Sequence, residues 1–113
     1  MTPRLASSVL VSALLRRAEA EGGFGAVLAK GDESAGSILV VLLEKGRNPR
    51  IFARALGLDG SYSWSPLATQ RAGNAQEVPE FIARQRHFDP DLWVLELDIP
   101  SAERFADEMN VIG

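Results

Sequence analysis

Short apolar segments alternate with polar turns in the middle of the sequence, between Gly23 and Ala68. Four apolar runs follow one another there, and each gap contains Gly, Asp, Asn or Pro, the residues that favour turns. The gaps are too short to hold a crossover helix, so the spacing predicts an antiparallel β-meander in which consecutive strands are neighbours. The predicted strands cover residues 24–29, 38–43, 51–56 and 62–67.

The second run, residues 38–43, is apolar at all six positions. A strand without a polar face is typical of burial on both sides, so we expect it to be central in the sheet. A single helical layer rarely covers both faces of a sheet this small. We therefore expect either a second helical layer or a partner on the other face.

Three segments instead show the spacing of amphipathic helices. Ser7 or Ser8 can cap the first, and Gly22-Gly23 ends it. Pro79 fits the first turn of a second helix, and Ser101 can cap a third. The apolar face of the first helix consists of Leu10, Val11, Leu14, Leu15 and Ala18.

A fifth strand is predicted at residues 92–99, where large apolar residues alternate with smaller or acidic ones. The order α-β-β-β-β-α-β-α in one domain of residues 1–113 predicts an α+β fold. We expect an antiparallel meander of about five strands with helices packed on it. The first helix should lie across one face, and the fifth strand should pair within the same sheet.

Composition limits the possible chemistry. The chain has no cysteine, which excludes disulfides and sulfur-ligated metal sites and is compatible with the cytoplasmic location that we expect. No apolar stretch approaches the ~20 residues that span a bilayer, and Arg16-Arg17 follows the first apolar run too closely for an export signal. The net charge of −3 makes nucleic acid a possible but not a favoured partner.

The chain contains a series of short motifs: residues 11–17, Gly22-Gly23-Phe24, Gly31-Asp32, Ala35-Gly36, Arg84-Gln85 and residues 88–94. Their order and spacing, over about residues 5–98, resemble those of a family of small bacterial proteins known only as a domain of unknown function. The resemblance implies a small α+β protein of the bacterial cytoplasm and implies no activity.

Arginine accounts for ten of the twelve basic side chains, and it suits bidentate recognition of phosphate or carboxylate. Arg16 and Arg17 lie in the first predicted helix, Arg54 in the third strand and Arg84 in the second helix. If Arg16, Arg54 and Arg84 converge, they can clamp a phosphate or the carboxylates of a partner. In the alternative, the arginines pair with carboxylates of the same chain, such as Asp89, Asp91, Glu96 or Glu44.

The single histidine, His87, lies close in sequence to Asp89 and Asp91. In an extended segment these three side chains point to one side, as a metal or acid–base site requires. The alternative is a turn in which the two aspartates bond backbone amides. We favour the turn, and we expect no metal, no cofactor and no catalytic residue.

These patterns favour a small interaction module, without catalytic activity, that binds another protein or itself through a sheet face or edge. The alternative is an arginine-mediated binder of an anionic ligand, either nucleic acid or a nucleotide. An enzyme is the least favoured class. The candidate ligand-binding residues are Arg16, Arg17, Arg54, Arg84, Asp89, Asp91 and Trp93.

Overall fold

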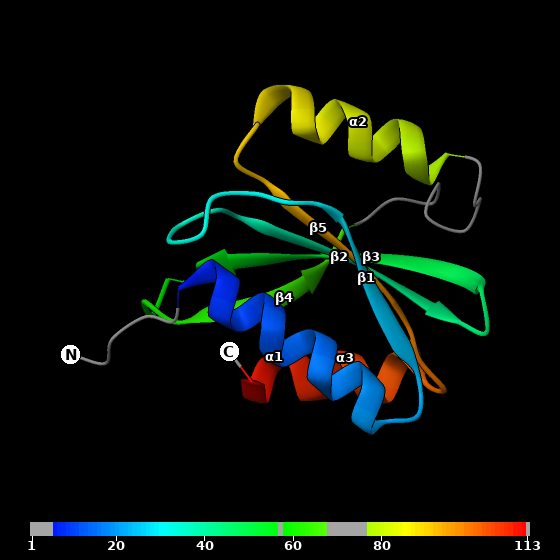
Figure 1. The fold of residues 1–113 in the computed structure, drawn as a ribbon. Helices are drawn as coiled ribbons and strands as arrows, with labels where there is room; N and C mark the ends of the chain where they lie inside the picture. Colours follow the sequence, from blue (N-terminus) through cyan, green and yellow to red (C-terminus); the bar gives the residue numbers. More distant parts are fainter. Residues whose placement is uncertain (1–5, 57, 68–76, 113) are drawn as a thin grey trace.

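The computed structural model describes residues 6–56, 58–67 and 77–112. It consists of a five-stranded sheet with helices on both faces (Figure 1). The α+β class and the order α-β-β-β-β-α-β-α are as predicted. The helices are α1 (Ser7–Ala20), α2 (Val78–Phe88) and α3 (Ala102–Ile112). The strands are β1 (Phe24–Ala29), β2 (Ile38–Glu44), β3 (Arg47–Leu56), β4 (Tyr62–Pro66) and β5 (Trp93–Asp98).

Strand β2 is the third of five in the order β1-β5-β2-β3-β4. Its first five side chains are all buried, so its uniformly apolar sequence predicted its central place correctly. β2, β3 and β4 are antiparallel neighbours, as the turn-rich gaps predicted. The two residues with positive φ between β2 and β3, Lys45 and Gly46, form the tight turn that joins them.

The predicted pairing of β1 with β2 is wrong. β5 lies between them, antiparallel to β1 and parallel to β2, so the sheet is mixed. The prediction assumed that a gap too short for a helix forces two strands to be adjacent. Residues 30–37 are nevertheless long enough to cross the ~10 Å that separates next-but-one strands. β1 is therefore an edge strand.

Helices α1 and α3 lie side by side on one face of the sheet, called here the helix-pair face (Figure 1). Leu10 and Leu14 of α1 and Phe105 and Met109 of α3 are fully buried there. α1 also packs tightly on β1, since a Cβ at Gly25 would lie 2.8 Å from Cδ2 of Leu15.

The helix ends follow the predicted signals with one exception. α1 ends where Gly22 adopts a φ of +89° and donates its N–H to the carbonyl of Glu19. Ser101 caps α3, because its Oγ accepts a hydrogen bond from the Arg104 N–H at 3.3 Å. Ser7 is the exception: it lies inside α1, and its buried hydroxyl donates to the carbonyl of Gly36 at 2.6 Å.

The opposite face of the sheet carries α2 and is called here the α2 face (Figure 1). Of the two alternatives that the apolar sequence of β2 left open, a second helical layer or a partner, the structure shows the helical layer. Val78 is the buried residue of α2, while Phe81 and Ile82 are half-buried against the sheet. The helix therefore covers this face incompletely. None of the described helices is both long and apolar enough to cross a membrane.

Candidate functional site

The arginines predicted to form a clamp are on different sides of the molecule. Arg16 is exposed on α1. Arg54 pairs across the sheet with Trp64, a residue of the helix-pair core. Arg84 is exposed on α2, which covers the opposite face. The structure thus does not bring Arg16, Arg54 and Arg84 together.

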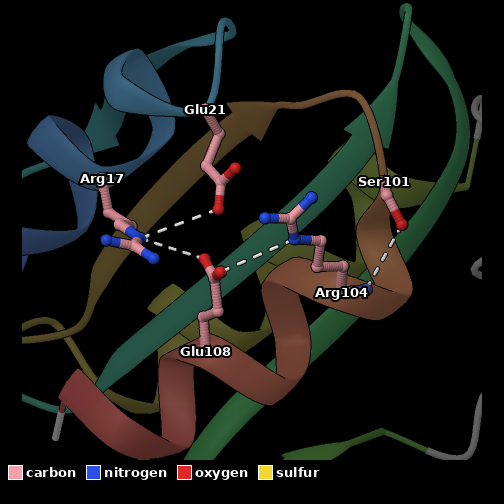
Figure 2. A network of polar contacts seen from close by, with 5 residues as sticks. All are labelled: Arg17, Glu21, Ser101, Arg104 and Glu108. Atoms are coloured by element: carbon pink, nitrogen blue, oxygen red, sulfur yellow. Dashed lines mark hydrogen bonds and ion pairs between the residues drawn. The ribbon is translucent and has the colours of Figure 1, made fainter.

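Arg17 makes ion pairs within the chain, in a network that joins α1 to α3 (Figure 2). Its Nε lies 3.0 Å from Oε2 of Glu108 and 3.7 Å from Oε1 of Glu21. Arg104 approaches the other oxygen of Glu108 at 3.7 Å. Glu21 is four residues from Arg17 on the same helix, whereas Glu108 is 91 positions away, too far for sequence spacing to indicate the contact.

The pKa values of the two carboxyl groups in this network are shifted in opposite directions. The hydrogen bond from Arg17 lowers the pKa of Glu108 to about 2. The pKa of Glu21 is raised, chiefly because its carboxyl group hydrogen-bonds to that of Glu108 and because it is partly buried. Glu108 therefore stays ionised between the two arginines, and its role is to fasten the two helices together.

The depressed pKa of Glu108 makes the stability of the protein depend on pH. Ionised Glu108 stabilises the folded state above its ordinary pKa of 4.5, and this contribution is lost as the pH falls towards 2. The raised pKa of Glu21 acts in the opposite sense and offsets part of the effect. Glu108→Gln is expected to lower the urea midpoint at neutral pH, and the difference from the wild type should vanish near pH 2.

Asp107→Asn serves as the control for this measurement, because it removes an exposed carboxylate from the adjacent position of α3. The effect of Glu108→Gln should also shrink in high salt, since the side chains of the network are partly exposed. The assigned role would be contradicted if the urea midpoint of Glu108→Gln differed from that of the wild type by the same amount at every pH.

Arg54 stacks on an aromatic ring. Its guanidinium carbon lies 4.3 Å from the centre of the Tyr62 ring, at the distance of a cation–π contact. The pair borders a hollow of about 80 Å³ that is also lined by Ser7 and by residues 34–38. That Arg54 binds a ligand there remains a prediction.

The acidic segment after α2 forms the predicted turn. Asp89 Oδ1 accepts a hydrogen bond from the Asp91 N–H at 3.2 Å, and the carbonyl of Asp89 accepts one from the Leu92 N–H. His87 is exposed and lies edge-on to the ring of Phe88. Across the described parts of the chain, no three acidic or histidine side chains gather as metal ligands would.

Trp93 is 5% exposed and holds a loop in place. Its indole Nε1 donates to the carbonyl of Asp32 at 2.7 Å. The Asp32 N–H in turn donates to the carbonyl of Asp91 at 3.0 Å, and the Asp32 carboxylate accepts from the N–H groups of Ser34 and Ala35. This set of contacts, called here the loop lock, connects residues 30–37 to the start of β5. Trp93 is therefore not available for stacking at the surface.

A groove of about 480 Å³ separates α2 from the sheet. Its walls are largely apolar, with Arg86 of α2 and Glu96 of β5 as the charged residues. Grooves of this size and character commonly bind ligands or parts of other proteins. The apolar wall includes Leu28, Val41, Leu43, Val78 and Ile82.

The groove extends to the edge strand β1. Leu28 lines the groove and is also the extra residue of a β-bulge, since the pairing of β1 with β5 shifts between Val27 and Ala29. Phe24, Val27 and Leu28 are 65%, 42% and 48% exposed. The strand has no charged residue and no proline, two of the usual protections of a sheet edge, although the bulge at Leu28 is a third.

Neither the groove nor the open edge was assigned from the sequence, because β1 was expected to pair with β2. The apolar content of residues 92–99 could have indicated that this strand is central in the sheet. The structure shows that Trp93, Val94, Leu95 and Leu97 are buried. Two strands that are buried on both faces require neighbours on both sides, which displaces the less apolar β1 to the edge.

Comparison with known proteins identifies the family. The model of a family described as a protein of unknown function, DUF1491, matches residues 5–107. The chain belongs to the DUF1491 family. This confirms the resemblance inferred from the motifs. Among curated proteins, none is significantly similar to this DUF1491 chain.

Solved structures of similar proteins share the fold. A crystal structure of a DUF1491 protein from Caulobacter crescentus is 31% identical with a TM-score of 0.81, covering 90% of this chain and 94% of that one. Protein Atu0922 from A. tumefaciens, solved in solution, is 29% identical with a TM-score of 0.77, covering 92% and 93%. An NMR structure of a Caulobacter crescentus DUF1491 protein has a TM-score of 0.76 at 31% identity, covering 93% and 94%.

Proposed function

We propose that this DUF1491 protein is a small cytoplasmic interaction module without catalytic activity, and that it binds another protein or a second copy of itself. The supporting observation is the apolar surface in which the open edge of β1 meets the groove beneath α2, called here the edge surface. It includes Phe24, Val27 and Leu28, three large apolar side chains on one six-residue strand. Exposed apolar surface of this kind usually marks a site of protein association.

The main chain of β1 supports the same function. An edge strand has unpaired N–H and C=O groups, and another polypeptide can satisfy them by adding a strand. The neighbouring groove can then accept apolar side chains of the added segment, which would give the contact its specificity.

The alternative, an arginine-mediated binder of nucleic acid or a nucleotide, has less support. Arg17 is engaged by Glu108 and Glu21. Arg84 lies on α2, on one face of the sheet. Arg54 pairs with Trp64, which is buried on the other face. The charge density that a polyanion requires is therefore divided between two sides of the molecule.

A pair of matched substitutions tests the proposed function. Leu28→Glu puts a charge on the edge surface, close to Glu96, whereas Val9→Glu puts the same charge at a residue of α1 that is 52% exposed. Leu28→Glu is expected to weaken association about tenfold or more, because covering a leucine contributes about 1.5–3 kcal/mol. Val9→Glu should behave as the wild type.

The measurements are light scattering after size exclusion over a range of concentrations and affinity capture from the native bacterial lysate. Circular dichroism confirms that both variants are folded. The proposal fails if the wild type stays monomeric and retains no protein, or if the two variants associate as well as the wild type does.

A further inference from the structure

As an extension that rests on the proposed function, we infer that the partner of the edge surface is a second copy of this chain. The two copies join by antiparallel β1–β1 pairing about a twofold axis at Ala26. The exposed apolar side chains of β1 extend from Phe24 to Leu28, the bulge residue, and the midpoint of this segment is Ala26. An antiparallel pair centred on this residue uses the whole segment in both copies.

The register between β1 and β5 shows to which face of the sheet each side chain of β1 belongs. Phe24 and Ala26 are opposite Asp98 and Glu96 of β5, and Leu28 lines the groove, so these residues belong to the α2 face. Gly25 and Val27 pair with Leu97 and Leu95, which belong to the helix-pair core.

Pairing centred on Ala26 makes both faces self-complementary. On the α2 face, Phe24 of each copy lies opposite Leu28 of the other, at the mouth of its groove. On the helix-pair face, Val27 of each copy lies opposite Gly25 of the other, beside the Leu15 side chain that packs on Gly25. The strand has no charge, so no pair of like charges arises across the axis.

A second copy fits this surface better than an unrelated strand does. It places Phe24 of each copy against Leu28 of the other, and it covers the exposed residues of both copies at once. An isologous contact of this kind closes after two subunits and leaves no free β1 edge to extend the sheet. The dimer would have one continuous ten-stranded sheet, given the five strands of each copy.

A cysteine at the axis reports the pairing directly, because the chain has no other cysteine. Directly opposed residues of antiparallel strands have Cα atoms about 4.5–5.5 Å apart, within the range of a disulfide. With oxidised glutathione, Ala26→Cys is expected to form a covalent dimer at least about tenfold faster than Ser63→Cys. Ser63 is the matched control, since it is exposed on β4, the other edge strand of the sheet.

A pair of charged variants tests the register. Phe24→Lys and Leu28→Glu should each remain monomeric in light scattering, because each places a charge against an apolar side chain in both halves of the dimer. An equimolar mixture should recover the dimer, since one half then pairs the introduced lysine with the introduced glutamate and the other half restores Phe24 against Leu28. In a mixture of Val9→Glu with Phe24→Lys, Val9→Glu should dimerise with itself as the wild type does, and Phe24→Lys should stay monomeric.

The possible outcomes separate this inference from the proposed function. Fast crosslinking of Ala26→Cys together with recovery in the mixture supports the dimer. If Ala26→Cys is no faster than Ser63→Cys while a captured protein is still lost in Leu28→Glu, the edge surface takes a different chain. The dimer is then wrong and the proposed function stands. If Ala26→Cys crosslinks no faster than Ser63→Cys and Leu28→Glu loses no captured protein, both proposals are wrong.

Discussion

Truncation of Phe105 to alanine is expected to lower the free energy of unfolding by about 3–5 kcal/mol. Phe105 is 1% exposed and lies in the core between α3 and the sheet, so its removal loses apolar burial and leaves a cavity. A domain of this size is stable by only about 5–15 kcal/mol, and the variant should be close to unfolding at moderate temperature.

Phe88→Ala is the matched control, because the same side chain is removed from a site that is 80% exposed. Its expected effect is within about 0.5 kcal/mol. Urea denaturation measures both, and the slope of the transition should remain that of the wild type. Equal losses at the two positions would mean that Phe105 is not part of the core as described.

The second large effect is expected at Gly31, in the loop lock. A Cβ at this position would lie 2.1 Å from the carbonyl oxygen of Asp91 and 2.8 Å from its carbonyl carbon. Backbone atoms cannot move aside as a flexible side chain can, so Gly31→Ala must displace the loop. We expect a loss of about 2–3 kcal/mol, the usual range for overpacking in a rigid setting.

The displacement should also be visible in Trp93, because its indole donates to the carbonyl of Asp32, next to Gly31. In Gly31→Ala, the Nε1–H resonance of Trp93 should shift and exchange faster with solvent. Ser34→Ala is the control in the same loop, since the bonds of Ser34 use its backbone atoms. An unchanged indole resonance in a fully stable Gly31→Ala protein would contradict the loop lock.

Local patterns were sufficient for the elements themselves. The spacing from Leu10 to Ala18 predicted the buried face of α1. The apolar run in β2 predicted its central place and gave the second helical layer as one of two alternatives. These features depend on neighbours within a few positions, where periodicity and turn residues act directly.

Strand order could not be predicted in the same way. Whether β1 pairs with β2 or with β5 depends on the burial of residues that are distant in sequence, and gap length does not decide it. The contacts of the candidate site could not be predicted for the same reason. The partner of Arg17 is Glu108, and the edge surface exists because β5 takes the place beside β2. The turn at Asp89 was predictable, because its bonds span two or three residues.

The place of β5 also has a consequence for the order in which the protein acquires its structure during synthesis. Within the described residues, β1 pairs with β5 alone, and α1 packs against α3. β1 therefore cannot pair with its neighbouring strand until β5 has left the ribosome, and α1 cannot complete its packing until α3 has done so. Nascent chains that stop before β5 should leave β1 without its strand partner, and the sheet should be completed only once β5 has been synthesised.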